Sequence, residues 1–453
     1  MGYRLSLTRR EFLALLGAGS AGLALGDYGF AAENKDKKPP NIVLIVADDL
    51  GYGELGCQGN AEIPTPNIDS IAASGVRFTS GYVSCPVCSP TRAGLITGRY
   101  QQRFGHEFNP GPQAAQNFGL PLSETTLASR LKSTGYKTGM VGKWHLGSKA
   151  GYTPLDRGFD EFFGFLLGGH PYLQPGGPDN PILRGAKPVE EKEYLTDAFA
   201  REAKAFIEKH KKETFFLYLT PNAVHSPMQA TKEYLSRFPT TGDQKRRTFS
   251  AMLSALDDAV GDTLKALRDN NLEENTLVFF ISDNGGPTAE TTSGNGPLNG
   301  HKGGVRDGGI RVPFMMQWKN HLPAGVVSDT PVISLDIAPT ALAAAAAKVK
   351  GAKFDGVNLL PYLGRNSRRE VHDALYWRFG NQYAIRQGDW KLAIFGKNAP
   401  ELYNLAEDIG EKTDLAAQKP DKVKELREKL MQWDSKLAKP LWQTRRAARP
   451  AGK

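Results

Sequence analysis

The 453-residue chain contains only three cysteines, and after residue 40 it has no apolar run of about 18 residues. The first absence excludes a small protein stapled by disulfides, and the second argues against an integral membrane protein. Acidic residues are missing from positions 435–453, where six lysines and arginines account for most of the net charge of +9. Because the remaining charge is nearly balanced, nucleic acid is not an expected partner. Hydrophobic residues, at 40%, suffice for the large core of a globular protein.

The first 32 residues have the three parts of an export signal. Arg9 and Arg10 precede a 14-residue apolar stretch at positions 12–25, and small residues follow it. The arginine pair and the residues after it resemble the twin-arginine signal, which exports folded proteins. The apolar stretch is too short and too glycine-rich for a membrane anchor. We therefore predict that residues 1–32 are a cleaved signal peptide, that the twin-arginine export machinery is a partner, and that the mature protein is periplasmic or extracellular.

Four apolar segments end abruptly in polar residues. They occupy positions 41–47, 137–141, 215–219 and 276–281. Helical patterns lie between them, at positions 122–133, 196–209 and 249–270. Continuous apolar strands that alternate with helices are typical of a mostly parallel sheet covered by helices on both faces. Ligands bind such sheets beyond the carboxyl ends of the strands, so we expect the polar residues there to converge on one edge.

Acidic residues follow two of these segments directly. Asp48 and Asp49 come after the first segment, and Asp283 with Asn284 comes after the last. Their carboxylate and amide oxygens are the ligands that Ca²⁺ and Mg²⁺ prefer. The alternative is that each pair only caps the next helix, which is common for acidic residues after a strand. Two pairs at corresponding strand ends favour a metal site, because carboxylates brought together without a cation repel one another.

Two cysteines lie in the sequence Cys85-Pro86-Val87-Cys88, which has the spacing of a redox pair. No second cysteine pair exists to complete a four-cysteine zinc site. Residues 88–99 have the pattern of a turn that enters a short helix, with Pro90 near its first position. A group at position 88 would therefore face the positive end of a helix, where an oxyanion is favoured.

The segment from Cys88 to Arg92 resembles the Cys-x-Pro-x-Arg signature of the type I sulfatases, in which the cysteine is oxidised to formylglycine. Other segments resemble further motifs of this family: residues 48–51, 142–147, 225–227, 282–285 and 307–313, and Lys302. Residues 307–313 begin with Asp307, where the family more usually has Glu. The resemblance extends over nearly the whole mature chain and is to arylsulfatases and N-acetylgalactosamine-6-sulfatases.

This resemblance implies an alkaline-phosphatase-like α/β fold. A large mixed, mostly parallel sheet sandwiched by helices would form an N-terminal catalytic domain at residues 33–353. A smaller antiparallel sheet and a helix would form a C-terminal subdomain at residues 354–439, followed by a basic tail at residues 440–453. Short alternating strands after residue 373 and an amphipathic pattern at residues 423–437 agree with the smaller subdomain.

The resemblance also implies a role for each candidate site residue. The metal ligands would be Asp48, Asp49, Asp283, Asn284 and the formylglycine formed from Cys88, with Ca²⁺ as the expected ion and Mg²⁺ as the alternative. Hydrated formylglycine has two hydroxyls, of which one would attack sulfur and the other would later collapse to the aldehyde and eject sulfate. The other catalytic residues would be Arg92, which holds the hydrate, Lys143 and Lys302, which bind sulfuryl oxygens, and His145 and His225, which transfer protons.

The remaining histidines divide into two groups. Weaker candidates for contacts to the leaving group lie in Gly- and Pro-rich segments: His106, His170 and His301. Three others are expected to be structural: His210, His321 and His372.

Together these residues predict a sulfuric ester hydrolase that removes sulfate from carbohydrates, by exo action, and from aryl sulfates. Its partners would be the sulfated substrate and a formylglycine-generating maturation enzyme. Two alternatives remain: a phosphonate or phosphate ester hydrolase of the same superfamily, and an unmatured, non-catalytic binder of sulfated glycans.

Overall fold

The computed structural model describes residues 38–111, 118–174, 177–347, 353–363 and 370–443. The predicted signal peptide and residues 444–453 of the predicted basic tail lie outside the described residues. The described residues from Pro39 onward form one compact unit. Within the described ranges, no helix has both the length and the apolar composition needed to cross a membrane.

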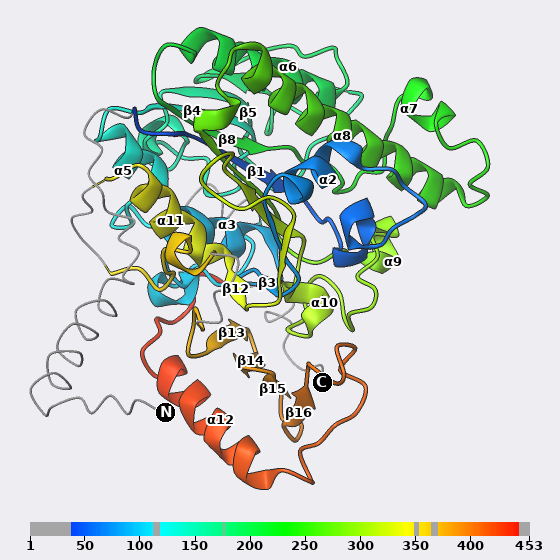
Figure 1. The fold of residues 1–453 in the computed structure, drawn as a ribbon, viewed down its shortest axis with the longest axis vertical. Helices are drawn as coiled ribbons and strands as arrows, with labels where there is room; N and C mark the ends of the chain where they lie inside the picture. Colours follow the sequence, from blue (N-terminus) through cyan, green and yellow to red (C-terminus); the bar gives the residue numbers. More distant parts are fainter. Residues whose placement is uncertain (1–37, 112–117, 175–176, 348–352, 364–369, 444–453) are drawn as a thin grey trace, which may run out of the picture. The chain divides into compact units, whose positions relative to one another are not determined.

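A ten-stranded mixed sheet lies at the centre of the fold (Figure 1). Its strands, in spatial order, are β11 (Val326–Ser328), β2 (Val76–Phe78), β10 (Phe314–Gln317), β9 (Thr276–Ser282), β1 (Asn41–Ala47), β8 (Phe215–Thr220), β4 (Lys137–Lys143), β5 (Glu161–Phe165), β6 (Leu183–Arg184) and β7 (Lys187–Pro188). The central run from β9 to β5 is parallel, whereas β10, β6 and β7 run antiparallel to their neighbours. The four predicted strands are confirmed.

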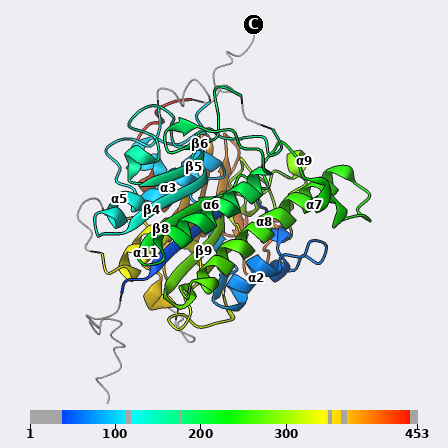
Figure 2. The same ribbon diagram turned by 90° about the horizontal axis from the view of Figure 1, so that it is seen from above.

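Helices cover both faces of this sheet, and the alternation of side chains along β1 shows why. Ile42, Leu44 and Val46 belong to one apolar core, and Val43 and Ile45 belong to the other. The first core is completed by α3 (Cys88–Thr97), α5 (Leu127–Lys132) and α11 (Ile337–Ala344). The second is completed by α2 (Pro66–Ala73), α6 (Leu195–His210) and α8 (Gln244–Asp269), and Figure 2 shows α6 and α8 side by side. Burial on both faces explains the continuous apolar strands.

Two of the three predicted helices are confirmed, α6 to within one residue at each end and α8 with a start five residues earlier than predicted. Helix α8 begins at Gln244, because the Asp243 side chain accepts a hydrogen bond from Arg246 N and caps it. The third prediction, a helix over residues 122–133, is too long. The helix there is α5, which starts only at Leu127, where Thr126 caps it by accepting from Ser129 N.

The remaining elements are short, apart from one long helix. They are β3 (Gly81–Tyr82), β12 (Val332–Ile333), α7 (Lys232–Ser236), α9 (Thr288–Thr291), α10 (Asp307–Ile310) and α12 (Pro420–Asp434). Single turns of 3-10 helix lie at Tyr52–Glu54, Gly56–Gln58, Gln101–Phe104, Leu155–Arg157, Glu273–Asn275, Ser334–Asp336 and Leu360–Tyr362.

The C-terminal part forms a separate antiparallel sheet of four strands. These are β13 (Leu375–Phe379), β14 (Gln382–Gln387), β15 (Trp390–Phe395) and β16 (Glu401–Asn404), in that order. Helix α12 packs beside this sheet, where the rings of Tyr376 and Trp433 stack 5.2 Å apart. A buried ion pair of 2.6 Å between Asp307 of α10 and Lys391 of β15 joins this sheet to the larger part. The expected fold class is confirmed.

Candidate active site

The polar residues after the parallel strands meet at one edge of the large sheet. Asp48 and Asp49 follow β1, Asp283 and Asn284 follow β9, and Lys143 is the last residue of β4. All five side chains are buried. Asp49 has a φ of 62°, in the left-handed region that costs a residue with a side chain free energy. The chain is therefore held in an unfavourable conformation at the point where its carboxylate enters the site.

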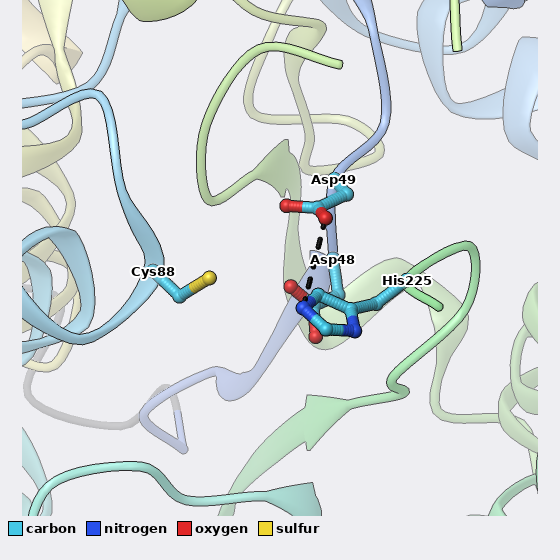
Figure 3. Close-up of side chains that lie close together, drawn as sticks. All are labelled: Asp48, Asp49, Cys88 and His225. Carbon is cyan, nitrogen blue, oxygen red and sulfur yellow. Dashed lines mark ion pairs between the residues drawn. The ribbon is translucent and has the colours of Figure 1, made fainter. Parts of the chain in front are cut away.

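Four side chains offer metal-ligand atoms within 4.8 Å of one another: Asp48, Asp49, Cys88 and His225 (Figure 3). Two buried oxygens at this edge, Asp48 Oδ1 and Asn284 Oδ1, have no hydrogen-bond partner among the described residues, although Arg92 Nη2 lies 3.8 Å from the first. Leaving buried acceptors without a partner costs free energy. Together with the carboxylates around them, these free oxygens fit a bound hard cation.

Each of the three site carboxylates has one basic side chain within 2.7 Å. The pairs are Arg92 with Asp283 (2.7 Å), Lys143 with Asp48 (2.6 Å) and Lys302 with Asp49 (2.7 Å). The formal charges of these six residues cancel. A bound divalent cation would therefore give the site a net positive charge, which attracts an anionic substrate.

This arrangement shifts the pKa values of the buried acids. Burial alone raises the pKa of Asp48, but Lys143 and the neighbouring cations outweigh it, so the pKa lies well below its usual range. Burial and the charge of Asp48 raise the pKa of Asp283 to about 6. Burial also raises the pKa of Cys88 to about 12, against the effect of Lys143. Because a thiol rather than a thiolate predominates at neutral pH, an unmodified Cys88 is a poor nucleophile.

The predicted short helix is present as α3, but it begins at Cys88, two residues before Pro90, and follows the extended residue Val87. Arg92 lies one turn further along the same buried helix. Its Nε and Nη2 donate to Asp283 Oδ2, and its Nη1 donates to the Lys143 carbonyl. Arg92 thus orders the residues around position 88, and its predicted contact with the hydrate stays a prediction.

The two predicted catalytic histidines both lie at this edge. Burial and the positive charge of Lys143 lower the pKa of His145 well below its usual range, so its imidazole is neutral. The Nε2 of His225 lies 3.7 Å from Asp49 Oδ2 (Figure 3), and its Nδ1 lies 2.6 Å from the Ser226 carbonyl. Because a carbonyl oxygen only accepts, Nδ1 carries a proton and Nε2 is the atom available to the site.

The weaker candidates differ in their surroundings. His106 is fully buried with Nε2 2.7 Å from Ser89 Oγ, and His170 is buried with Nδ1 2.7 Å from the Pro171 carbonyl. Of these three, only His301 is exposed. The histidines expected to be structural contact other parts of the fold: His210 pairs with Glu161 and Glu213, His372 pairs with Asp336, and His321 stacks on Trp318.

Sequence reasoning missed Ser89. Its Oγ donates to the His145 carbonyl (2.6 Å), and its backbone N donates to Asn109 Oδ1 (2.9 Å). Ser89 therefore connects the first turn of α3 to the backbone of one predicted catalytic histidine. Its position directly after Cys88, inside the signature segment, was the signal that could have identified it.

Comparisons with known proteins agree with this geometry. The family model for sulfatases matches residues 40–347, and the model for the N-sulphoglucosamine sulphohydrolase C-terminal region matches residues 302–437. Arylsulfatase A of Homo sapiens is 34% identical over 83% of each chain. N-acetylgalactosamine-6-sulfatase of Mus musculus is 35% identical over 82% of this chain and 75% of its own. The crystal structure of Ps i-CgsB in complex with k-i-k-neocarrahexaose has a TM-score of 0.86 and 37% identity, and covers 90% of this chain and 96% of that chain.

Proposed function

The chain belongs to the sulfatase family and is a sulfuric ester hydrolase, and from this premise we propose that it removes sulfate from a carbohydrate by means of a formylglycine at position 88 and a divalent cation. The observation that carries the proposal is the group of ligand atoms on Asp48, Asp49, Cys88 and His225, within 4.8 Å of one another. The carbohydrate substrate is supported by a similar protein named for N-acetylgalactosamine and by a similar structure that contains a neocarrahexaose.

The cation would be held by Asp48, Asp49, Asp283, Asn284 and the modified residue 88. This oxygen-rich set suits Ca²⁺, with Mg²⁺ as the alternative. When bound, the cation would polarise the sulfuryl oxygens and the attacking hydroxyl. When formed, hydrated formylglycine would supply one hydroxyl as nucleophile and a second that permits elimination of sulfate. In the structure, the Cys88 Sγ stands in for these hydroxyls.

The basic side chains would bind the substrate anion. The Nζ of Lys143 and of Lys302 lies against a carboxylate at the same edge of the sheet, and Lys302 remains 16% exposed. Both ammonium groups would donate to sulfuryl oxygens and offset the charge that develops on them, an effect of about 10² in rate for one such donor. Arg92, which is bonded to Asp283, would keep the residues around position 88 in place.

The two histidines would move protons at the two ends of the reaction. His225 would deliver a proton from Nε2 to the leaving oxygen, because its Nδ1 is already engaged with the Ser226 carbonyl. Asp49, whose Oδ2 lies 3.7 Å from this Nε2, would stabilise the protonated ring. The neutral His145 would take the proton from the second hydroxyl as sulfate leaves.

We further propose that residues 1–32 direct export by the twin-arginine route, to the periplasm or the exterior, after Cys88 has been modified. Cys88 is only 1% exposed in the folded chain. A formylglycine-generating enzyme would therefore have to reach it before folding is complete. Folding and maturation in the cytoplasm would then be followed by export of the folded protein, which is the task of that route.

A turnover comparison tests this proposal. The full chain is produced in its own host or together with a formylglycine-generating enzyme. It is assayed on an aryl sulfate, 4-methylumbelliferyl sulfate, and on an aryl phosphonate monoester. It is also assayed on two saccharides, N-acetylgalactosamine 6-sulfate and neocarrahexaose. We expect both the aryl sulfate and at least one of the saccharides to lose sulfate, with kcat/KM for the aryl sulfate above that for the phosphonate. Faster phosphonate cleavage would contradict the assigned chemistry. Aryl sulfate turnover without sulfate release from either saccharide would contradict the assigned substrate class.

A further inference from the structure

A cavity of about 660 Å³ lies between the two sheets. Thr79 and Ser80, after β2, and Asp329, after β11, line one side, and Leu375 of β13 and Asp389, between β14 and β15, line the other. Among the described residues that line it, none belongs to the candidate active site. We call it the seam cavity. Its volume is in the usual range for small-molecule sites, roughly 300–1,000 Å³.

Two arginines that line the seam cavity, Arg311 and Arg386, are each only 5% exposed. Their hydrogen bonds use Nε and Nη1: Arg311 donates to the Thr79 carbonyl and Asp307 Oδ2, and Arg386 donates to the Gly388 carbonyl, Ser80 Oγ and Tyr82 Oη. Neither Nη2 has a hydrogen-bond partner in the part of the chain that the structure describes. Neither Nη2 is among the buried atoms that lack a partner, so both are open to water in the cavity, and a ligand could take the place of that water. These donors suit a ligand that brings oxygen acceptors into the cavity.

Both guanidinium groups are held by the same carboxylate. Arg311 Nη1 lies 3.3 Å from Asp307 Oδ2, while Arg386 reaches that oxygen through Tyr82, whose hydroxyl accepts from Arg386 (2.6 Å) and donates to Asp307 (2.8 Å). The groups are thus fixed before any ligand arrives. Such preorganisation lowers the entropic cost of binding.

The charges around Asp307 do not cancel. The Nζ of Lys391 lies 2.6 Å from Asp307 Oδ1 and 2.9 Å from Glu411 Oε1, and all three side chains are buried. We call Asp307, Lys391, Glu411, Tyr82, Arg311 and Arg386 the seam cluster. It contains three basic side chains and two acidic ones. The base of the seam cavity is therefore positively charged and attracts an anionic group.

The rim of the seam cavity has the opposite charge. Three carboxylates are exposed there, those of Asp329, Glu370 and Asp389. Carboxylates repel a free inorganic anion but accept hydrogen bonds from hydroxyl groups. A ligand that fits both regions carries an anionic group for the arginines and several hydroxyls for the rim, which is the chemistry of an acidic saccharide.

We propose that the seam cavity is a second saccharide site, which binds a sulfated sugar unit of the polymer whose esters the active site hydrolyses. The identification of the ligand as a sulfated sugar rests on the proposed function. The sulfate group is held by Nη2 of Arg311 and Arg386, and the hydroxyls of the ring face Asp329 and Asp389. Occupation of this site keeps a long substrate bound between successive hydrolytic events.

The test fills the cavity and measures binding and turnover. Ala374 and Ala406 line the cavity, and Ala406 is exposed, so Ala374→Trp and Ala406→Trp should fill it without touching the arginines. Ala417→Trp is the matched control, because Ala417 is exposed and lies outside the lining. Asp389→Ala is a fourth variant that removes a rim acceptor without adding bulk, and it decides the question if the filled variants do not fold.

Binding is measured by calorimetry on the full chain carrying Cys88→Ala, with neocarrahexaose and a chondroitin 6-sulfate hexasaccharide as probes. We expect two sites for at least one probe, one site after filling, and an affinity at the second site at least tenfold weaker in Asp389→Ala. The control variant keeps two sites. A single site for both probes before filling, or two sites that survive filling and Asp389→Ala, would overturn the proposal. Inorganic sulfate that binds the second site as tightly as the saccharides would reduce it to a simple anion site and also overturn the proposal.

Turnover separates this inference from the proposed function. In the matured enzyme, filling should raise KM for the sulfated polymer severalfold and leave turnover of 4-methylumbelliferyl sulfate within twofold. A polymer KM unchanged by filling contradicts the second site while the proposed function stands. If the matured enzyme without cavity substitutions releases no sulfate from any saccharide, the proposed substrate class is wrong. The number of binding sites measured by calorimetry still decides whether the seam cavity binds sugars.

Discussion

The active site and the seam cluster are both buried groups of acids and bases, but they leave different kinds of atom without a partner. At the active site the free atoms are acceptors, Asp48 Oδ1 and Asn284 Oδ1. In the seam cluster both oxygens of Asp307 are hydrogen-bonded and Glu411 Oε1 forms an ion pair with Lys391 at 2.9 Å, whereas Nη2 of Arg311 and of Arg386 has no partner among the described residues. Free acceptors suit a cation and free donors suit an anion. The chemistry of a buried charged group thus depends less on its composition than on which of its hydrogen bonds are unmade.

The largest effect should come from position 88. In Cys88→Ser the residue that would become formylglycine has only one hydroxyl, so the covalent sulfate ester cannot be released by elimination. We expect kcat on 4-methylumbelliferyl sulfate to fall by at least ~10³-fold, with little change in melting temperature because the side chains are similar in size. Cys57→Ser, at a partly exposed cysteine outside the site, is the matched control and should remain active. Retention of most of the rate by Cys88→Ser would refute the role of the second hydroxyl.

The next effect compares two buried aspartates directly. Asp48→Asn removes a carboxylate from the candidate active site, so binding of the proposed divalent cation should weaken and kcat should fall by about 10²-fold or more. Metal content is measured by mass spectrometry of the digested protein, and activity is measured after chelation and after calcium is restored. A chelated enzyme that is free of metal and fully active would remove the need for the proposed ligands.

Asp307→Asn should have the opposite outcome, a loss of stability without a loss of turnover per folded molecule. It removes the carboxylate with which the buried Lys391 forms its shortest ion pair, and this should lower the free energy of unfolding by about 3–5 kcal/mol. The double variant Asp307→Asn with Lys391→Met should recover part of this loss, because it removes one of the buried positive charges that Asp307 had offset, and the recovery stays partial because Glu411 then loses its lysine partner. A fall in kcat of the folded Asp307→Asn enzyme as large as that of Asp48→Asn would show that the two clusters are not functionally distinct.

The pH dependence sharpens this result. Burial raises the pKa of Asp307, but Lys391 and two arginines outweigh it and lower the pKa from 3.8 to about 2. Because the folded pKa is below the unfolded one, this contribution to stability is complete above about pH 4 and is lost as the pH falls through about 2. Denaturant unfolding should therefore show a larger difference between the parent enzyme and Asp307→Asn at pH 7 than at pH 3. An equal difference at both pH values would argue against the ionised pair.

The smallest effect should come from Trp442, near the C-terminal end of the described chain, which packs against residues that contact the active site. Trp442 donates from Nε1 to the Phe108 carbonyl (3.1 Å) and packs edge-on against His106 (4.7 Å between ring centres), whose Nε2 contacts Ser89. Trp442→Ala should lower kcat by a few fold through looser placement of Ser89, and Trp442→Phe, which keeps an aromatic ring, should restore most of it. If both variants have the parent kcat, this chain of contacts does not reach the site.

Sequence reasoning identified the strands and the residues at their ends because both depend on local pattern. The segment 41–47 is predicted with its observed limits, since a strand buried on both faces must be continuously apolar and must stop at Asp48. Strand ends that share one edge also predicted that Asp48, Asp49, Asp283 and Asn284 lie together, and their roles as metal ligands stay predictions.

The seam cluster could not be predicted in the same way. Asp307 pairs with Lys391, 84 positions later, and its backbone N donates to Glu411, 104 positions later. No periodicity or spacing connects residues so far apart, and each taken alone resembles a solvated surface charge. The partner of Arg92 was missed for the same reason, since Asp283 lies 191 positions away. Long-range pairing of charges is set by tertiary packing, which a single sequence does not display.

The central claim, that an aldehyde replaces the thiol at position 88, is tested most directly by mass spectrometry of the peptide that contains Cys88, taken from active enzyme of the native host. The account predicts a peptide that has lost sulfur, gained a carbonyl oxygen and reacts with a hydrazide probe, in proportion to the specific activity of the sample. Active enzyme whose peptide carries an intact cysteine thiol would contradict it.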